Sequence, residues 1–318
     1  MTRPQRPVHV LVYAPDDAEA FARLVKAPAR SVVLHVCHTP AEVAGAIEEA
    51  EVIYTWGFPT ELLPRAKRLR WVQTMGAGVD AFLRPGLLPP GVVVTRTIGA
   101  HGPWMAEYVV GHLLARLLDL DRVRADQEAR RWPMYFPGRL HGKTLGLVGI
   151  GAIGRHIARV ARALGMRVIG LGRSRRVAPF VERVYPRRDL RTMLGLCDVV
   201  VVAVPLTPET RGLIGAAEFR AMTRRPWFLN LGRGPVVDEP ALIAALRQER
   251  LAGAILDVFA EEPLPPESPL WTMPNVVITP HMAGPTDPEQ VVPTFNENLR
   301  RYLAGARLRN VVDRRRGY

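Results

Sequence analysis

The segment that most constrains the fold is Gly149-Ile150-Gly151-Ala152-Ile153-Gly154, which fits the pattern G-x-G-x-x-G. It comes directly after an apolar stretch with strand character, residues 144–149, and directly before a helical stretch, residues 155–164. In such a unit the glycines allow a tight turn, close approach of the backbone to a pyrophosphate, and close helix–strand packing. An ordinary strand-to-helix turn is the alternative, but the context favours a dinucleotide site. The predicted cofactor contacts in this turn are Gly149, Gly151, Ile153 and Gly154.

The rest of the chain alternates strands and helices in two runs, which predicts two parallel α/β sheets. The first run has expected strands at residues 8–13, 31–37, 52–54, 69–73 and 92–95, with helices at residues 16–26 and 41–50. A long apolar helix, residues 103–120, is expected to connect the two runs. The second run has six expected strands, at residues 144–149, 166–171, 199–203, 227–231, 253–256 and 276–279. A last helix is expected at residues 287–303, with Pro293 as a kink.

The predicted fold class is therefore α/β, with two Rossmann-like or flavodoxin-like parallel-sheet domains separated by an active-site cleft. Residues 1–99 together with 287–318 are expected to form a discontinuous substrate-binding domain. Residues 100–286 are expected to form the dinucleotide-binding Rossmann domain.

The end of the next strand indicates which dinucleotide is bound. A site that prefers NAD places an acidic residue about 20 positions after the glycines, where it holds the ribose hydroxyls. Here the strand ends in Gly172, and cations and a hydroxyl follow, which can meet a 2′-phosphate. We therefore expect NADP(H), with NAD(H) as the alternative, and we expect Arg173, Ser174 and Arg175 to contact the cofactor.

Composition limits the other classes of function. The formal charge is +13, which raises the question of a nucleic-acid partner, but the excess comes from arginine without a motif for binding nucleic acid. No run of apolar residues is long enough for a membrane span, and no signal peptide is apparent, so a cytoplasmic protein is expected. Cys37 and Cys197 lie in apolar stretches with strand character, so buried thiols are expected rather than a disulfide.

Three further segments each bring an ionisable residue to the predicted carboxyl end of a strand, where open α/β sheets bind their ligands. They are residues 230–234 with Arg233, residues 256–263 with Asp257 and Glu262, and residues 279–284 with His281. Together with residues 99–107, 205–210 and 268–271, these segments resemble the signature of the D-2-hydroxyacid dehydrogenases over nearly the whole chain.

The resemblance implies a role for each of these positions. Arg233 would bind the substrate, Glu262 would orient and tune the histidine, and His281 would give and take the proton. Glu261 is the neighbouring carboxylate, and Glu262 fits the pattern because it directly precedes Pro263. The remaining implied cofactor contacts are Pro205, Thr210, Leu231, Gly232, Asp257 and Gly284.

The chemistry requires these residue types in their own right. Hydride transfer to a 2-oxo acid leaves negative charge on the carbonyl oxygen, so a protonated imidazole must supply a proton. A histidine titrates near neutral pH and suits this step, and a nearby carboxylate favours its charged form. The planar guanidinium of an arginine can hold a carboxylate through two parallel hydrogen bonds. Structural salt bridges at strand ends are the plainer alternative for each residue alone.

In the first domain, the turn of residues 75–80 resembles the family loop whose backbone N–H groups bind the substrate carboxylate. Ala77 and Gly78 are the implied contacts, and they are expected to face Arg233 across the cleft. Arg96 departs from the family pattern, because relatives often have Asn there. His35 and His38 flank Cys37 but point to alternate faces of one strand, so no metal site is expected.

The expected activity is that of an NAD(P)-dependent D-2-hydroxyacid dehydrogenase acting on a small 2-oxo or 2-hydroxy acid, with glyoxylate or hydroxypyruvate favoured by association within the family. A homodimer is expected from the same resemblance. The alternatives are a dinucleotide-sensing scaffold of the same fold without significant turnover, and a dehydrogenase for formate or phosphite.

Overall fold

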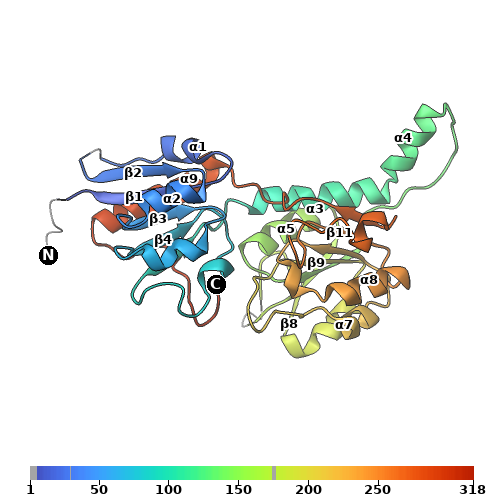
Figure 1. Ribbon diagram of the computed structural model, residues 1–318. Helices are drawn as coiled ribbons and strands as arrows, with labels where there is room; N and C mark the ends of the chain where they lie inside the picture. Colours follow the sequence, from blue (N-terminus) through green and yellow to red (C-terminus); the bar gives the residue numbers. More distant parts are fainter. Residues whose placement is uncertain (1–5, 29, 174–176) are drawn as a thin grey trace. The chain divides into compact units, whose positions relative to one another are not determined.

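The computed structural model of the protein describes residues 6–28, 30–173 and 177–318. The chain divides into two compact units, Met1–Ala100 with Thr286–Tyr318, and His101–Pro285 (Figure 1). The sequence placed the boundaries after residues 99 and 286, and the roles expected for the two units stay predictions.

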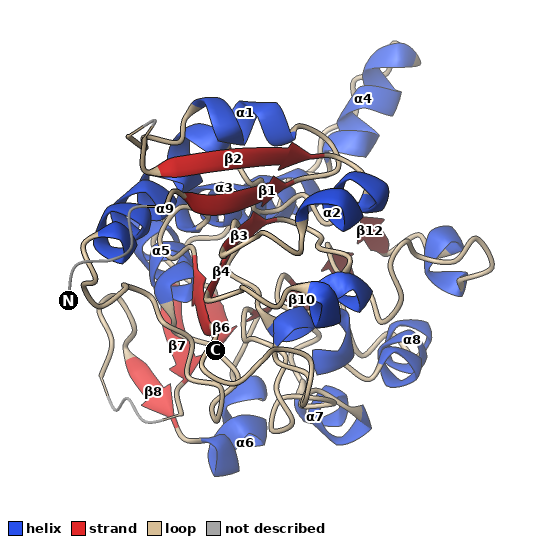
Figure 2. Ribbon diagram, turned by 60° about the vertical axis from the view of Figure 1, so that its left-hand side comes forward, coloured by secondary structure: helices blue, strands red, loops and turns tan. Residues whose placement is uncertain are grey.

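The first unit is built on a five-stranded sheet in the order β2-β1-β3-β4-β5, in which all strands run parallel (Figure 2). This order belongs to the flavodoxin-like doubly wound type. Its strands are β1 (Val8–Tyr13), β2 (Val32–Cys37), β3 (Val52–Thr55), β4 (Trp71–Thr74) and β5 (Val93–Arg96). Its helices are α1 (Ala18–Arg23), α2 (Pro40–Ala46) and α9 (Pro288–Leu303). The last helix is a single element that contains Pro293.

Both faces of this sheet are buried, because successive side chains of a strand point to opposite sides. Leu11 and Tyr13 of β1 join a core with α2, whereas Val10 and Val12 join a second core with α1 and α9. In that second core Trp71 and Phe295 stack, with their ring centroids 5.3 Å apart. The C-terminal helix is thereby fixed to the sheet of the first unit.

The second unit has a seven-stranded parallel sheet in the order β12-β11-β10-β9-β6-β7-β8. The sequence predicted six strands, and the additional one is the short edge strand β8. Its strands are β6 (Thr144–Val148), β7 (Arg167–Leu171), β8 (Arg183–Tyr185), β9 (Val199–Val202), β10 (Trp227–Asn230), β11 (Gly253–Leu256) and β12 (Val276–Ile278). Its helices are α3 (Gly102–Leu117), α4 (Leu120–Glu128), α5 (Ala152–Ala163), α6 (Leu190–Leu194), α7 (Ala216–Ala221) and α8 (Glu239–Arg247).

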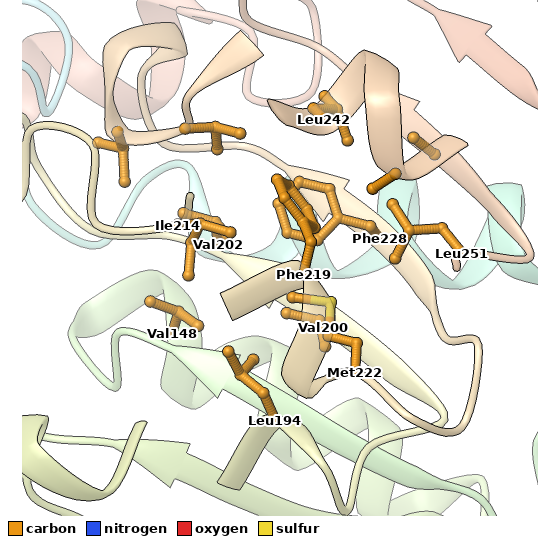
Figure 3. Close-up of a cluster of buried hydrophobic side chains, with 14 of the residues drawn as sticks. Val148, Leu194, Val200, Val202, Ile214, Phe219, Met222, Phe228, Leu242 and Leu251 are labelled. Carbon is orange, nitrogen blue, oxygen red and sulfur yellow. The ribbon is translucent and has the colours of Figure 1, made fainter. Parts of the chain in front are cut away.

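Strand β9 illustrates how this sheet holds two cores. Val199 and Val201 pack with α3 and α5, whereas Val200 and Val202 pack on the other face with α6, α7 and α8. Figure 3 shows part of the latter cluster, in which Phe219 and Phe228 meet edge to face with their centroids 5.4 Å apart. A continuous run of valines is thus the expected pattern for a strand that is covered on both sides.

The connector predicted over residues 103–120 is broken near its end. Helix α3 ends at Leu117, and Asp119 adopts a left-handed conformation with φ of 51° before α4 begins. Figures 1 and 2 both show α4 standing away from the sheet of the second unit. None of the helices in the described part of the chain combines the length and the apolar character needed to cross a membrane.

Both cysteines are buried and free, as the sequence predicted. Cys197 lies against Gly146 of β6, where an added Cβ atom would come within 2.3 Å of its Sγ atom. Such a distance is far below contact, so the sheet has room for a side chain at position 197 only because position 146 has none.

We predict that Gly146→Ala lowers the free energy of unfolding by about 1 to 3 kcal/mol, because the new methyl group overpacks a core that is already filled. The loss should be largely absent when Gly146→Ala is made in a Cys197→Ala background, since the clashing sulfur is then gone. Urea denaturation of the two single variants and the double variant measures this coupling. Gly111→Ala in α3 is the matched control, because outside the adjoining residues and the backbone of that helix no atom lies within 4 Å of the added Cβ. Additive effects of the two substitutions would contradict the explanation.

Candidate functional site

The glycine-rich turn after β6 has the geometry that a dinucleotide needs. Gly149 has a φ of 112°, and an added Cβ would lie 2.7 Å from the carbonyl oxygen of Ala203. An added Cβ on Gly154 would lie 2.1 Å from the oxygen of Gly149, so neither position accepts a side chain. Above Gly151, by contrast, the space is open.

Helix α5 starts at this turn with Gly151 as its N-cap and Ile153 in its first turn. Among the described residues no side chain caps this helix. Its first N–H groups can therefore donate hydrogen bonds to the oxygens of a phosphate. The turn therefore fits the pyrophosphate of a dinucleotide, with the open space at Gly151 as the point of approach.

The cations expected to set the cofactor preference are only partly described. Arg173 follows Gly172 at the end of β7 and forms an ion pair with Glu209, with Nη2 and Oε1 2.8 Å apart. Ser174 and Arg175 lie outside the described residues. The ion pair places Arg173 next to the loop that follows β9.

That loop and the one after β10 are packed together. Thr210 Oγ1 donates to the carbonyl oxygen of Pro205 at 2.6 Å and accepts from the N–H of Thr207 at 2.8 Å. An added Cβ on Gly232, which follows Leu231, would lie 2.7 Å from the oxygen of Val204. The structure thus brings the predicted residues Pro205, Thr210, Leu231 and Gly232 to one edge of the sheet.

Arg233 comes next in the chain, and its Nη1 atom donates to the carbonyl oxygen of Gly232 at 2.8 Å. Gly234 then packs so tightly that an added Cβ would lie 1.7 Å from the oxygen of Phe259. This contact holds the segment of Arg233 beside the segment that leads to Glu262.

Glu262 and His281 form a direct pair, in which Nδ1 of the histidine lies 2.8 Å from Oε2 of the carboxylate. The other carboxylate oxygen, Oε1, accepts the N–H of Phe259 at 3.0 Å. Both side chains are 36% exposed, so the pair is open to a ligand. The structure places Glu262 rather than Glu261 against the histidine, and the Glu262–Pro263 peptide bond is cis.

The charge of Glu262 is set by opposing influences. Burial disfavours the carboxylate, but the hydrogen bonds from His281 and from the Phe259 N–H, with the nearby positive charge of Arg233, outweigh burial and lower its pKa. The site therefore holds an ionised carboxylate against an imidazole, with a guanidinium close by. Such a set can bind an anion and move a proton.

Asp257 directly follows β11 and is buried, with 2% of its surface exposed. Its carboxylate accepts hydrogen bonds from Thr279 Oγ1 at 2.6 Å and from the N–H groups of Met282 and Ala283 at 2.8 and 3.0 Å. These donors lie on both sides of His281. Asp257 thus contacts the segment that carries His281, whereas the sequence predicted only a position near the cofactor.

Sequence reasoning missed two members of this network, Tyr108 and Thr279. The hydroxyl of Tyr108, which belongs to α3, lies 2.7 Å from Thr279 Oγ1. Gly284, a predicted cofactor residue, lies against the same helix, where an added Cβ would be 3.2 Å from Met105 and 3.3 Å from His101. Thr279 could have been found from its place two residues before His281, but helical spacing alone does not single out Tyr108.

In the first unit, the turn after β4 is fixed by its own hydrogen bonds. Thr74 Oγ1 donates to the oxygen of Gly76 at 2.9 Å, and Arg96 Nη1 donates to the oxygen of Ala77 at 3.2 Å. Burial lowers the pKa of Arg96 from its usual range. Arg96, the residue that departs from the family pattern, therefore contacts the turn that holds the predicted residues Ala77 and Gly78.

The same unit brings together three side chains that could hold a metal ion, His9, His35 and Glu49, whose donor atoms lie within 4.8 Å of one another. His9 Nδ1 and His35 Nε2 are 2.9 Å apart, which is the distance of a direct hydrogen bond between the rings. His38 is not in this group, and the prediction of no metal stays a prediction.

Comparison with known proteins gives a consistent result. Residues 110–283 match the family model described as "D-isomer specific 2-hydroxyacid dehydrogenase, NAD binding domain". The glyoxylate/hydroxypyruvate reductase A of Photorhabdus laumondii subsp. laumondii is 33% identical over 280 residues, which are 86% of this chain and 90% of that protein.

Two solved structures are similar over nearly the whole chain. A D-isomer specific 2-hydroxyacid dehydrogenase from Xanthobacter autotrophicus Py2, in complex with NADPH and MES, is 35% identical with a TM-score of 0.87, covering 98% of this chain and 100% of that one. An NADPH-dependent glyoxylate/hydroxypyruvate reductase from Sinorhizobium meliloti, in complex with NADP and sulfate, is 34% identical with a TM-score of 0.86, covering 98% and 99%.

The lowered pKa of Glu262 leads to a prediction about stability and pH. A carboxyl group whose pKa falls on folding stabilises the fold above its unfolded value, 4.5, and loses that contribution as the pH drops through the folded value. Glu262→Gln should therefore lower the melting temperature at pH 6 to 7, and the difference from wild type should shrink below pH 4.5. Thermal unfolding followed by circular dichroism over this pH range measures it. Glu261→Gln is the control, and a difference that is equally large for both variants would refute the assignment.

Proposed function

Because the chain belongs to the D-isomer specific 2-hydroxyacid dehydrogenase family, we propose that it is an enzyme that transfers a hydride between NADP(H) and a small 2-oxo or 2-hydroxy acid. The observation that carries this proposal is the His281–Glu262 pair, with Nδ1 and Oε2 2.8 Å apart and the positive charge of Arg233 nearby. A dehydrogenase of 2-hydroxy acids needs both an anion-binding cation and a proton donor, and this group of side chains supplies them.

The cofactor supplies the hydride when bound, and the glycine-rich turn with Gly149, Gly151 and Gly154 is proposed to hold its pyrophosphate. Arg233 binds the carboxylate of the substrate. In the direction of reduction, His281 donates a proton to the carbonyl oxygen, which becomes the hydroxyl oxygen of the product. Because Nδ1 faces Glu262, Nε2 is the atom proposed to give the proton, and Glu262 stabilises the imidazolium before transfer. Ala77 and Gly78 of the first unit are the other proposed contacts of the substrate.

The preference for NADP(H) is supported by Arg173 at the end of β7 and by the absence of an acidic residue at that strand end, where Gly172 stands. The solved relatives from Xanthobacter and Sinorhizobium are complexes with NADPH and NADP. Glyoxylate or hydroxypyruvate is the substrate we favour, because similar proteins carry the name glyoxylate/hydroxypyruvate reductase. A sensing scaffold without turnover is the less favoured alternative.

We predict that the purified protein oxidises NADPH in the presence of glyoxylate or hydroxypyruvate, with a higher kcat/KM than for NADH. His281→Gln should lower kcat by about 100-fold or more, the usual contribution of general acid catalysis. NADPH binding, followed by its fluorescence, should persist in the variant, since the proton donor is not needed to bind the cofactor. Loss of absorbance at the nicotinamide band measures the rates.

A matched control for this experiment is His141→Gln, because His141 lies near Gly165 at the other end of α5, away from the proposed proton transfer. Equal turnover by wild type and His281→Gln would remove the proposed role of the histidine. NADPH binding without turnover on any 2-oxo acid would favour the sensing scaffold.

We further propose that the protein is a homodimer and that the segment after α4 contributes to the interface. Trp132, Met134 and Phe136 are 93%, 87% and 100% exposed in the single chain. Three large apolar side chains so close in sequence form a surface that a second copy can bury. We also infer a cytoplasmic location, where reduced nicotinamide cofactors are available.

We predict that Trp132→Ser together with Phe136→Ser shifts the protein from dimer to monomer in light scattering after gel filtration, because the apolar surface that drives association is lost. Val177→Ser is the control, since Val177 is also 82% exposed but lies elsewhere in the second unit. A monomeric wild type, or a dimer that survives both substitutions, would rule out this interface.

A further inference from the structure

The histidine of the proposed site lies in a chain segment with unusual backbone geometry. His281 has a φ of 52°, a left-handed conformation that side-chain-bearing residues seldom adopt. Its own N–H donates to the carbonyl oxygen of Asp257 at 3.0 Å. A conformation of this kind persists only where the surroundings hold it, so the contacts of the segment decide where the imidazole lies.

Most of these contacts converge on one buried carboxylate. Asp257 accepts the N–H groups of Met282 and Ala283, and its Oδ1 atom also accepts the hydroxyl of Thr279 at 2.6 Å. The segment is thus held by Asp257 on both sides of His281. Since the carboxylate is buried, a lost donor would leave a buried acceptor unpaired, so each of these hydrogen bonds matters for holding Asp257 in place.

The donors in the two hydrogen bonds that link Tyr108, Thr279 and Asp257 follow from the one proton that each hydroxyl carries. Thr279 has one hydroxyl proton, and an ionised carboxylate can only accept, so that proton points to Asp257. The oxygen of Thr279 must then accept the proton of Tyr108, whose hydroxyl lies 2.7 Å away. Burial, which outweighs the hydrogen bond to Thr279, and the charge of Asp257 raise the pKa of Tyr108 to about 12, so the phenol keeps its proton.

Helix α3 touches the segment a second time. Gly284 packs against Met105 and His101, and Met105 lies three residues before Tyr108, on the same side of the helix. One helix thus contacts the segment on either side of the histidine, at Thr279 and at Gly284. The start of α3 is also the point where the chain enters the second unit.

We propose that Tyr108 and Thr279 are positioning residues that hold the His281 segment through Asp257, so that the imidazole meets Glu262 in the geometry needed for proton transfer. This inference rests on the proposed function for its catalytic part. Neither hydroxyl is assigned a contact with substrate or cofactor. Their effect is to fix the left-handed turn, and a small displacement of a catalytic group is enough to slow a reaction.

The kinetic test uses Tyr108→Phe, Thr279→Val, the double variant and Thr279→Ser. We expect kcat to fall about threefold to tenfold in Tyr108→Phe and about tenfold or more in Thr279→Val, with the KM for NADPH within about twofold of wild type. The double variant should be no slower than Thr279→Val, since the two hydroxyls act in one chain. Thr279→Ser should restore most of kcat because it keeps the hydroxyl.

The matched control is Tyr302→Phe in the first unit. Tyr302 is a buried tyrosine, 8% exposed, whereas Tyr108 is partly buried, and the Tyr302 hydroxyl donates to Glu51. Tyr302→Phe should leave kcat unchanged, although it removes a tyrosine hydrogen bond that is charge-assisted and so stronger than the one between Tyr108 and Thr279. Melting temperatures of all variants establish that each protein is folded when its rate is measured.

A second readout does not depend on turnover. Amide hydrogen exchange of the peptide that contains residues 279–284, measured by mass spectrometry on the unliganded protein, should be about tenfold faster in Thr279→Val than in wild type. If Thr279→Val exchanges faster but wild type turns over no 2-oxo acid, the proposed function is wrong and the positioning role is retained. Turnover by wild type with unchanged exchange and kcat in both hydroxyl variants would overturn the positioning role alone. Additive losses in the double variant would also overturn it.

Discussion

The site depends on how closely the loops after neighbouring parallel strands approach one another. The loops after β6 and β9 meet at Gly149, where an added Cβ would lie 2.7 Å from the oxygen of Ala203. The loops after β9 and β10 meet at Gly232, and those after β10 and β11 meet at Gly234. At each junction the backbone occupies the place of a side chain, so each loop is positioned by the next. Residues distant in the sequence are thereby brought to one edge with little freedom.

This packing also couples the charges of the site. The segment at Phe259 that leaves no room for a side chain at Gly234 also donates its N–H to Glu262. Arg233 directly precedes that glycine, so the cation and the carboxylate are fixed by the same backbone contact. The lowered pKa of Glu262 is a consequence of this arrangement, because burial is outweighed by the hydrogen bonds from His281 and from the Phe259 N–H.

Much of this was predictable because it depends on local patterns. The alternation of strands and helices follows from the pattern of apolar residues, and the glycine-rich turn follows from its motif. The segments of Arg233, Glu262 and His281 were placed at strand ends by the same pattern, and their roles were implied by the family resemblance. Other features depend on tertiary contacts that no motif encodes. The edge strand β8 has only three residues, which is too short to give a clear pattern. The break between α3 and α4 lies at Asp119, which adopts a left-handed conformation without being a glycine, so no glycine in the sequence marks it. Tyr108 belongs to a helix with many apolar residues, and its contact with Thr279 becomes visible only in the folded structure. The contact of Arg96 with Ala77 likewise appears only when two strands of the first unit are paired.

Two carboxylates on one stretch of chain show how the environment assigns different roles to the same group. Asp257 is 2% exposed, and the donors to its carboxylate among the described residues are neutral: the hydroxyl of Thr279 and two backbone N–H groups. Its charge is used to shape the backbone, and it has no titratable hydrogen-bond partner among these donors. Glu262 is 36% exposed and faces an imidazole, so its charge can respond when a proton moves. A buried carboxylate holding the turn and an exposed one holding the ring act on the same histidine from different directions. In the proposed mechanism, the turn sets where the imidazole lies and the pair with Glu262 sets Nε2 as the nitrogen that gives the proton, so proton transfer would require both.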